Sequence, residues 1–377
     1  MRIIVAGGGT GGHLYPGIAL AHEFRRRNPG NQILFVGSPR GLEKTVVPRE
    51  GFPLKTLMVE GLAGKSWHYV IRGLLKLPIA LLQSFWILAT FRPHLVVGVG
   101  GYVAGPFLLA AFLWRIPRII QEQNVFPGAT NRILAHLVNR VAISFPQSQA
   151  HFPKRKVWLT GNPIRREFLE MSRTQAPSPS HARESHPGPE GQEAGPSSHF
   201  HLLIFGGSQG AHRINLAMVE ALPHLRAVPD RLRIVHQTGA QDLSIVQEGY
   251  REQGVEAEIL PFIYDMADRY RWADLIVCRA GATTIAEITA AGKPALLIPF
   301  PYAIHNHQEI NARALQAAGA AEMILNSDLD GERLAQALLS LMDDPSRLQA
   351  MGEKARELGR TDAAEQLVNL GYELVEC

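Results

Sequence analysis

Two stretches of this 377-residue chain decide its fold. Residues 3–13 read I-I-V-A-G-G-G-T-G-G-H, and residues 202–212 read L-L-I-F-G-G-S-Q-G-A-H. In each stretch a short apolar run predicts a buried strand and the glycines predict a tight turn. A helix should follow, from about Pro16 in the first stretch. A shift of 199 residues brings His13 onto His212, so the chain contains two copies of one plan.

Further strand candidates alternate with helical patterns in both halves. They are Ile33–Val36, Leu95–Val99 and Arg118–Gln121, then Arg233–His236, Leu275–Val277 and Ala295–Ile298. Strands that alternate with helices predict parallel sheets with helices on both faces. The fold class is therefore α/β, with two Rossmann-like domains in residues 1–163 and 164–377. Residues 331–376 are predicted to form amphipathic helices.

One segment differs from the rest in composition. Residues 171–199 are rich in Pro, Ser, Gly, Glu and His, so burial cannot offset their ordering entropy and a disordered insert is predicted. The whole chain is 46% hydrophobic and 19% charged, as in globular proteins. Its two cysteines exclude a disulfide framework, and we expect neither a signal peptide nor a membrane-spanning helix.

Positive charge is concentrated in the first half. Residues 1–163 hold 19 Lys and Arg against five acidic residues, a formal excess of +14, whereas residues 164–377 carry −10. Such an excess attracts anions, so a phosphorylated substrate, an anionic membrane and nucleic acid are all candidate partners. A basic face that contacts only solvent is the alternative. Because the chain has no basic-aromatic RNA-binding signature and no zinc finger, we expect no nucleic-acid partner.

A glycine turn between a strand and a helix is suited to bind an anion, because backbone N–H groups and the helix dipole favour negative charge there. Gly7, Gly9 and Gly12 match the dinucleotide pattern G-x-G-x-x-G, which also needs an acid at the end of the second strand. Here that strand runs into G-S-P-R at 37–40, which argues against a nicotinamide cofactor. The alternative to a ligand site is that these glycines only allow the helix to pack closely against the strand.

The second half has more specific candidates. Residues 279–287, R-A-G-A-T-T-I-A-E, place hydroxyls and N–H groups at a helix start, which suits a diphosphate. Glu287 lies about one turn further, where it can accept from two ribose hydroxyls or simply stabilise the helix dipole. Gln308 and Asn311 share one helical face, where their amides suit sugar hydroxyls or solvent.

Six motifs, in order, resemble one known family. They are G-G-T-G-G-H at 8–13, G-V-G-G-Y-V-A-G-P at 98–106, Q-E-Q-N at 121–124, G-N-P-I-R at 161–165, G-G-S-Q-G-A at 206–211 and R-A-G-A-T-T-I-A-E at 279–287. Together they resemble the bacterial undecaprenyl-diphospho-muramoylpentapeptide β-N-acetylglucosaminyltransferases of glycosyltransferase family 28. The resemblance covers the chain except for residues 171–199. It implies a GT-B fold, in which two Rossmann-like domains face each other across a cleft.

The resemblance also implies the substrates and their sites. The C-terminal domain would bind UDP-N-acetylglucosamine, and the N-terminal domain would take the acceptor, lipid I, to give lipid II for peptidoglycan synthesis. The substrate-binding residues are carried over by motif. Ile263 would lie at the uracil, Glu287 at the ribose, and Asn124 and Gln308 at the sugar. The residues at the phosphates would be Ser208, Ala282, Thr283 and Thr284, and the remaining substrate-binding residues are Thr10, Gly11, Gly12, Arg165, Ile285 and Ala286.

The family forms a β-1,4 bond from an α-linked donor, so the resemblance implies a single inverting displacement by the muramoyl 4-hydroxyl. That step needs a base for the hydroxyl. His13 is the candidate, because an imidazole accepts a proton near neutral pH, with packing against the turn as the alternative. Glu122 is the second catalytic candidate, as a base or as the partner of an imidazole. His212 needs no catalytic role.

We expect no metal and no other cofactor. Asp328-Leu329-Asp330 fits the D-x-D pattern of a nucleotide-bound metal by letter, but it lies far along the chain from the glycine motifs. Helix N-termini and Arg165 are expected to stabilise the leaving diphosphate instead.

The stretch 67–88 is the most apolar part of the chain, with Arg72 and Lys76 inside it and Lys65 before it. A buried helix explains part of this, and the rest predicts an apolar patch with a basic rim that docks on an anionic membrane. We expect a peripheral enzyme on the cytoplasmic face of the bacterial inner membrane, with cell-wall assembly proteins as further candidate partners. The alternatives are a UDP-N-acetylglucosamine 2-epimerase and a GT-B transferase with a soluble acceptor.

Overall fold

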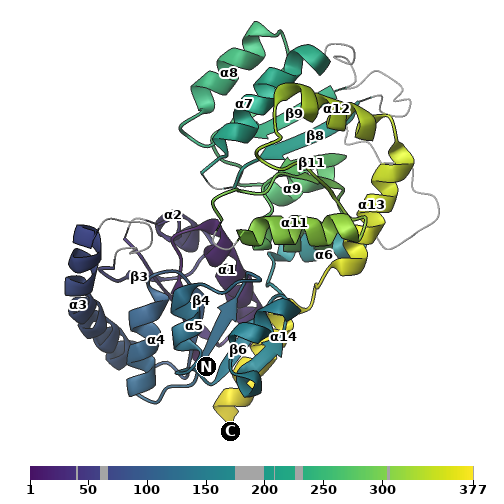
Figure 1. Ribbon diagram of the computed structural model, residues 1–377. Helices are drawn as coiled ribbons and strands as arrows, with labels where there is room; N and C mark the ends of the chain where they lie inside the picture. The colour runs from purple at the N-terminus through teal and green to yellow at the C-terminus, as the bar shows by residue number, and fades with distance from the viewer. Residues whose placement is uncertain are drawn as a thin grey trace, which may run out of the picture. The chain divides into compact units, whose positions relative to one another are not determined.

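The computed structural model in Figure 1 describes residues 1–39, 41–59, 67–174, 199–207, 209–225, 232–303 and 306–376. Lys65, Ser208 and residues 175–198 of the predicted insert lie outside the described residues, as does the side chain of Arg72. The first residues of the predicted insert are helical, because helix α6 (Arg166–Thr174) continues through them with Met171 buried.

The chain forms two compact units that are not continuous in sequence. The first comprises Met1–Arg166, Ala282–Ala286 and Arg360–Cys377, and the second comprises Glu167–Gly281 and Glu287–Gly359. The assignment of an acceptor domain to residues 1–163 and a donor domain to residues 164–377 stays a prediction.

The first unit contains a seven-stranded parallel sheet. Its order is β3 (Leu54–Thr56), β2 (Gln32–Gly37), β1 (Arg2–Gly7), β4 (Leu95–Gly100), β5 (Arg118–Glu122), β6 (Arg140–Ile143) and β7 (Val157–Leu159). The central strands are apolar at consecutive positions because both faces are covered. On β1, Ile4 and Ala6 enter one core while Ile3 and Val5 enter the other.

Helices cover each face of this sheet. One face packs against α3 (Trp67–Phe91), α4 (Ala104–Leu113) and α5 (Ala129–Leu134), and the other against α1 (Gly11–Arg27), α2 (Glu43–Arg49) and α14 (Ala363–Glu376). Short 3-10 turns lie at Pro146–His151 and Lys154–Lys156. The last helix, α14, lies along α1, where the Tyr372 hydroxyl accepts a hydrogen bond from Asn31.

Helix α1 begins earlier than predicted. The expected start was Pro16, but the first turn opens at Gly11, since the Thr10 carbonyl accepts from the N–H groups of His13 and Leu14. Glycines with low helix propensity hide this turn in the sequence. The consequence is that His13 belongs to the first turn of a helix and not to a free loop.

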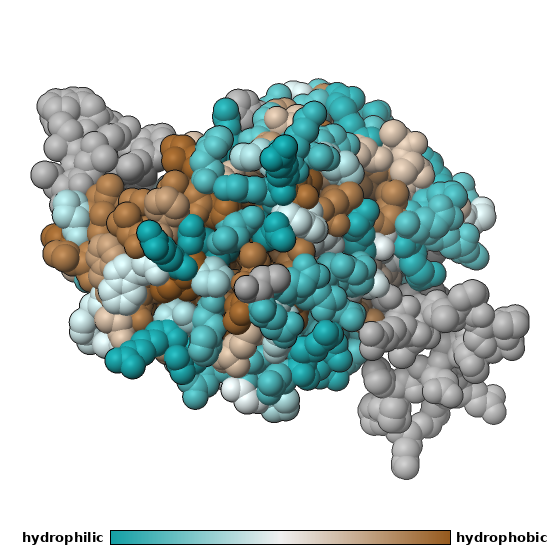
Figure 2. Space-filling view, turned by 90° about the horizontal axis from the view of Figure 1, so that it is seen from below, coloured by the Kyte–Doolittle hydropathy of each residue, from teal (hydrophilic) through white to brown (hydrophobic). Residues whose placement is uncertain are grey.

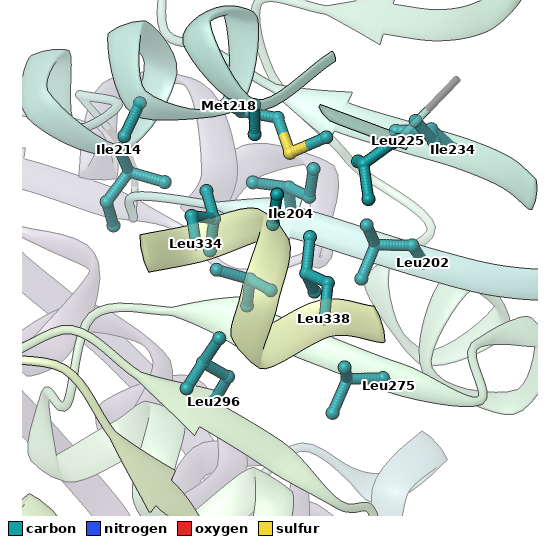
Figure 3. Close-up of a cluster of buried hydrophobic side chains, with 14 of the residues drawn as sticks. Leu202, Ile204, Ile214, Met218, Leu225, Ile234, Leu275, Leu296, Leu334 and Leu338 are labelled. Atoms are coloured by element: carbon teal, nitrogen blue, oxygen red, sulfur yellow. The ribbon is translucent and has the colours of Figure 1, made fainter. Parts of the chain in front are cut away.

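The second unit contains a six-stranded parallel sheet. Its order is β10 (Ala257–Leu260), β9 (Leu232–Gln237), β8 (Phe200–Phe205), β11 (Leu275–Cys278), β12 (Ala295–Leu297) and β13 (Glu322–Met323). Its helices are α6, α7 (His212–Ala221), α8 (Leu243–Glu252), α9 (Met266–Trp272), α10 (Ala282–Ala291, of which Ala282–Ala286 belong to the first unit), α11 (His307–Ala317), α12 (Gly331–Met342) and α13 (Pro345–Leu358), with a 3-10 turn at Leu222–Leu225. Figure 3 shows Leu202 and Ile204 of β8 packed with Leu334 and Leu338 of α12.

The predicted strands and the predicted amphipathic helices of residues 331–376 are confirmed. Helix α3 has a buried side and an exposed apolar side, as predicted for the stretch 67–88. Ala80, Ser84 and Leu88 are buried on one side, whereas Leu82 and Trp86 are 70% and 58% exposed on the other. None of the helices in the described part of the chain combines the length and the apolar character that crossing a bilayer requires.

Candidate functional site

The first glycine loop joins β1 to α1 and positions His13. Gly7, Gly8 and Gly9 have φ values of 150°, 136° and 93°, which side chains disfavour, so the loop requires glycine. The extended Thr10 then caps α1, and its Oγ1 lies 3.1 Å from Nδ1 of His13. The loop and the cap together fix the imidazole at the carboxyl end of the central strand β1.

A second glycine segment, at the end of β4, lies against this loop. A Cβ on Gly100 would lie 2.5 Å from Cδ2 and 2.9 Å from Nε2 of His13, and one on Gly101 would lie 2.5 Å from the Gly8 carbonyl oxygen. The motif at 98–106 is therefore shaped around the imidazole. Any side chain at residue 100 would displace the His13 ring.

The environment of His13 keeps its ring neutral. Loss of solvation lowers the pKa of His13 to about 4, although the negative charge of Glu43 raises it. The residue as a whole is half-buried and lies at the carboxyl edge of the sheet. At neutral pH the imidazole can therefore accept a proton, but a weak base needs help from its surroundings.

Glu43, the first residue of α2, was not singled out by the sequence analysis. Its carboxylate is almost fully buried and accepts hydrogen bonds from the Gly9 N–H at 3.0 Å and from both the N–H and the hydroxyl of Ser38 at 2.7 Å. The sequence does contain an acid close to the position that the dinucleotide pattern requires, because Glu43 follows the end of the second strand by six residues. The dinucleotide pattern requires its acid at the strand end itself, which is why this residue did not stand out.

Glu122 is buried at the end of β5 and organises its own loop. Its Oε1 accepts from the backbone and side-chain N–H groups of Asn124 at 2.9 and 3.2 Å, and its Oε2 accepts from Asn131 at 2.8 Å. Burial raises its pKa, and these hydrogen bonds oppose the rise. The carboxylate of Glu122 is thus directed at its own loop, while the hydrogen-bond partner of His13 is Thr10.

The remaining motifs of the first unit join the same network. Gln123 donates to the Val99 carbonyl at 2.8 Å, and Gln121 donates to Oδ1 of Asn162 at 3.1 Å. Three motifs, at 98–106, 121–124 and 161–165, are therefore linked by buried hydrogen bonds. Arg165, at the end of the third, has its guanidinium 4.4 Å from the ring centre of Tyr15 on α1.

The second glycine loop joins β8 to α7. Gly207 and Gly210 have positive φ, and the Gly210 N–H donates to the Gly207 carbonyl at 2.9 Å. His212, the counterpart of His13, lies 3.0 Å from the Asp242 carboxylate, which also accepts from Asn215. This pairing joins the first turn of α7 to Asp242, and the expectation that His212 needs no catalytic role stays a prediction.

The loop from β11 into α10 carries the predicted diphosphate and ribose residues. Gly281 caps α10, Ala282 and Thr283 lie in its first turn, and Glu287 follows one turn later with 5% of its surface exposed. Asn311 of α11 donates to the Ala280 carbonyl at 3.0 Å and fixes the loop. Thr284, Ile285 and Ala286 complete the turn between these ends.

Three other residues shape the same edge of the second sheet. Gln308 accepts a hydrogen bond from the Phe300 N–H at 3.0 Å, and its amide nitrogen is left to reach other groups. The Arg279 guanidinium donates to the Ile298 and Pro299 carbonyls at 3.1 and 3.0 Å. Ile263, after β10, is buried. The predicted sugar, phosphate and uracil residues after β10, β11 and β12 thus lie at the carboxyl ends of parallel strands, where such folds bind ligands.

The acidic pair at 328–330 has a local structural function. Asp330 caps α12 by accepting from the Arg333 N–H at 2.7 Å, and Asp328 accepts from Ser327. Among the residues that the structure describes, no three His, Cys, Asp or Glu side chains gather as a metal site.

Two family models match the chain. The glycosyltransferase family 28 N-terminal domain matches residues 3–143, and its C-terminal domain matches residues 201–367. A curated relative from Geobacter sulfurreducens is 50% identical over 98% of this chain and 97% of its own. It is named UDP-N-acetylglucosamine--N-acetylmuramyl-(pentapeptide) pyrophosphoryl-undecaprenol N-acetylglucosamine transferase. The chain belongs to this transferase family. A Myxococcus xanthus relative of the same name is 48% identical over 100% of this chain and 93% of its own.

Solved structures agree with the transferase family and its GT-B fold. The crystal structure of Acinetobacter baumannii MurG matches with a TM-score of 0.72 and 31% identity over 99% of both chains. A UDP-GlcNAc 2-epimerase from Neisseria meningitidis, bound to UDP-GlcNAc, matches with a TM-score of 0.66 but 14% identity, over 98% of this chain and 99% of its own. The second likeness shows the shared fold alone. The predicted GT-B architecture of two Rossmann-like units is confirmed.

Proposed function

We infer that this chain transfers N-acetylglucosamine from UDP-N-acetylglucosamine to the 4-hydroxyl of undecaprenyl-diphospho-MurNAc-pentapeptide, lipid I, and so forms lipid II for peptidoglycan. The observation that carries this inference is the near full-length identity of 50% to transferases named for these substrates. The glycine loops and polar strand ends of both sheets support it, since they supply the backbone N–H groups and hydroxyl-binding side chains that a nucleotide sugar needs.

The residues at the carboxyl ends of the second sheet's strands are proposed to bind the donor. The uracil would lie against the backbone at Ile263, and the ribose hydroxyls would donate to Glu287. Ser208 and the first turn of α10, Ala282 to Thr284, would face the diphosphate, where the helix dipole favours negative charge. Gln308 and Asn124 would contact the sugar.

The first unit is proposed to hold the acceptor and the base. The acceptor oxygen attacks C1 of the sugar, the bond from C1 to the UDP oxygen breaks, and the hydroxyl proton passes to the imidazole of His13. The configuration at C1 inverts in one displacement. The neutral state of the His13 ring supports this role, because a protonated ring could not accept the proton. Thr10, Gly11 and Gly12 fix the helix turn that carries it.

We propose that Glu122 acts by holding other residues in place. Its hydrogen bonds hold Asn124 and Asn131 in place, so its removal would move the loop that approaches the sugar. The leaving diphosphate would be stabilised by helix N-termini and Arg165, without a tightly bound divalent ion.

The chain is further proposed to dock on the anionic cytoplasmic face of the inner membrane. Figure 2 shows an apolar surface over α3 and α4 of the first unit. We call this the α3–α4 surface; its exposed side chains are Leu77, Ile79, Leu82, Trp86, Phe112, Leu113 and Trp114. Trp86 also contacts a cation, since the Lys55 ammonium lies 4.7 Å from its ring centre. Apolar insertion with basic neighbours is the chemistry of a peripheral membrane protein.

Radiolabelled donor tests the function and the base together. Wild-type enzyme should transfer label from UDP-N-acetylglucosamine to a lipid I analogue and release UDP only when the acceptor is present. His13→Ala should lower kcat by about 10² to 10⁴-fold, the range of general base catalysis. His212→Ala, its counterpart in the second unit, is the matched control and should keep most of the rate. Conversion of the donor without acceptor would favour an epimerase, and full activity of His13→Ala would remove His13 as the base.

A further inference from the structure

The carboxylate of Glu43 fills the position where a glycine loop normally holds an anion. It accepts from the Gly9 N–H within the loop at 3.0 Å, and from the N–H and hydroxyl of Ser38, at the end of β2, at 2.7 Å each. One buried side chain therefore joins two strand ends that lie side by side in the sheet. Backbone N–H groups of such loops otherwise bind phosphate oxygens.

Glycines surround the Glu43 side chain on three sides. A Cβ on Gly8 would lie 2.7 Å from its Cδ, a Cβ on Gly37 would lie 2.5 Å from its Cγ, and a Cβ on Gly41 would overlap its carboxylate oxygens. The carboxylate thus occupies a close-fitting position and does not merely sit on the surface. Three hydrogen-bond donors and the backbone of three glycines fix its location.

Glu43 also acts on His13. The loop residue that it holds, Gly9, directly precedes Thr10, whose hydroxyl lies at the His13 ring. Its negative charge raises the proton affinity of an imidazole that burial otherwise weakens. The other groups at the ring, Thr10 and the Gly100 backbone of β4, carry no charge.

We propose that Glu43 is a positioning residue for the transfer reaction: it closes the first glycine loop with an internal carboxylate and sets the place and basicity of His13. The proposal rests on the role of His13 given above. It also means that the Gly9 N–H serves the protein and not a substrate phosphate.

Glu43→Gln is the direct test. A glutamine has one oxygen, so one of the two backbone N–H groups, of Gly9 or of Ser38, must face an NH₂ group. We expect kcat for transfer to lipid I to fall by about ten- to a hundredfold, as expected for a displaced catalytic group. The Kd for UDP-N-acetylglucosamine, measured by calorimetry, should change less than about twofold, since the residues proposed at the uracil and the ribose, Ile263 and Glu287, lie in the second unit. Glu23→Gln, which removes a carboxylate on α1 that pairs with Arg26, is the matched control and should leave kcat unchanged.

A histidine titration separates this role from a purely structural one. In NMR spectra of the full chain, with the His13 signal assigned by its loss in His13→Gln, the wild-type ring should titrate near pH 4. In Glu43→Gln the midpoint should move to lower pH, and in Glu23→Gln it should not move. A fall in kcat with an unchanged His13 midpoint would assign Glu43 to the fold alone and overturn the proposal.

Gly37→Ala keeps the proposal testable if Glu43→Gln does not fold. Its Cβ would push the Glu43 side chain aside while the charge stays in the chain. We expect a fall in kcat with an unchanged donor Kd, and a wild-type kcat in either variant would refute the role of Glu43. A wild-type enzyme without any transfer would instead refute the proposed function, so the two failures are distinguishable.

Discussion

Gly100 is the residue on which the placement of His13 most directly depends. Its φ is 94°, and a Cβ at this position would lie only 2.5 Å from the His13 ring, so there is no room for a side chain. Gly100→Ala should therefore lower kcat by about a hundredfold, because the imidazole must move by about an ångström. The measurement is steady-state transfer to a lipid I analogue, together with the donor Kd, which should not change.

Gly51→Ala controls for backbone strain in that experiment. Gly51 also has a positive φ, of 74°, but the nearest atom to its Cβ would be 3.8 Å away. In both variants the left-handed backbone costs about 1 kcal/mol. If Gly51→Ala and Gly100→Ala lost the same fraction of kcat, the contact with His13 would not be the cause.

His236 makes the second unit sensitive to acid. It is fully buried between Tyr250 and Asn215, each 3.1 Å from one ring nitrogen, and burial lowers its pKa to about 3. An unfolded chain protonates this residue below its ordinary pKa of about 6.5, so the unfolded state binds more protons between pH 6.5 and 3. Stability from His236 is thus present above pH 6.5 and is lost as pH falls through this window.

The expected slope is about 1.4 kcal/mol for each pH unit below 6.5 from this residue. His236→Gln removes the titrating group, so its free energy of unfolding should depend on pH less steeply by about this amount. Urea denaturation at pH 4.5, 5.5 and 6.5 measures both slopes. Equal slopes for the two proteins would contradict a buried neutral imidazole.

At the scale of elements, the sequence was most informative where a buried strand ends in glycine. The runs at 3–6 and 202–205 form β1 and β8, because apolar positions covered on both faces leave a continuous pattern. The four short edge strands β3, β7, β10 and β13 were missed, and so was the four-residue strand β6. Two of the three residues of β3, Lys55 and Thr56, are exposed, and β13 has only two residues, so neither shows a period.

Residues that act through contacts distant in sequence were the hardest to predict. Glu43 bonds to Gly9, 34 residues away, and its position six residues after the end of β2 does not reveal that contact. Glu122 was predicted as a base or as the partner of an imidazole, and the positioning role proposed for it rests on its hydrogen bonds to Asn124 and Asn131. The return of α14 to α1 likewise depends on Asn31 and Tyr372, 341 residues apart. Local patterns contain no information on such pairs.

At the scale of elements, the membrane proposal rests on the α3–α4 surface. Leu82 and Leu113 are 70% and 57% exposed, and each buried leucine contributes about 1.5–3 kcal/mol on leaving water. The double variant Leu82→Gln, Leu113→Gln should therefore bind anionic vesicles at least about tenfold more weakly and unfold at an unchanged temperature. Ile245→Gln, on α8 of the second unit with 52% exposure, is the control. Vesicle co-sedimentation with unchanged binding would exclude this surface.

At the scale of the whole molecule, the charge excess of the first 163 residues adds an electrostatic part to that binding. Because salt screens exposed charges over about 10 Å at 0.1 M, binding to anionic vesicles should weaken between about 0.05 and 0.5 M salt. Binding to neutral vesicles should be weaker and nearly independent of salt. Equal binding to both vesicle types would contradict the electrostatic part.

The whole enzyme is expected to work without a divalent metal ion. Helix N-termini and Arg165 are proposed to stabilise the leaving diphosphate, and Asp330, part of the D-x-D sequence at 328–330, caps a helix. Transfer in excess chelator should therefore proceed at close to the full rate. Loss of activity in chelator that returns with added Mg²⁺ or Mn²⁺ would show that an ion carries this charge.

The central claim is tested most directly by the product itself. Purified enzyme should be mixed with UDP-N-acetylglucosamine and a lipid I analogue, and the new linkage should be determined by NMR of the isolated disaccharide. The account predicts a β-1,4 linkage to the muramoyl sugar and one UDP released for each bond formed. An α linkage, a different acceptor hydroxyl, or release of UDP without a disaccharide would contradict it.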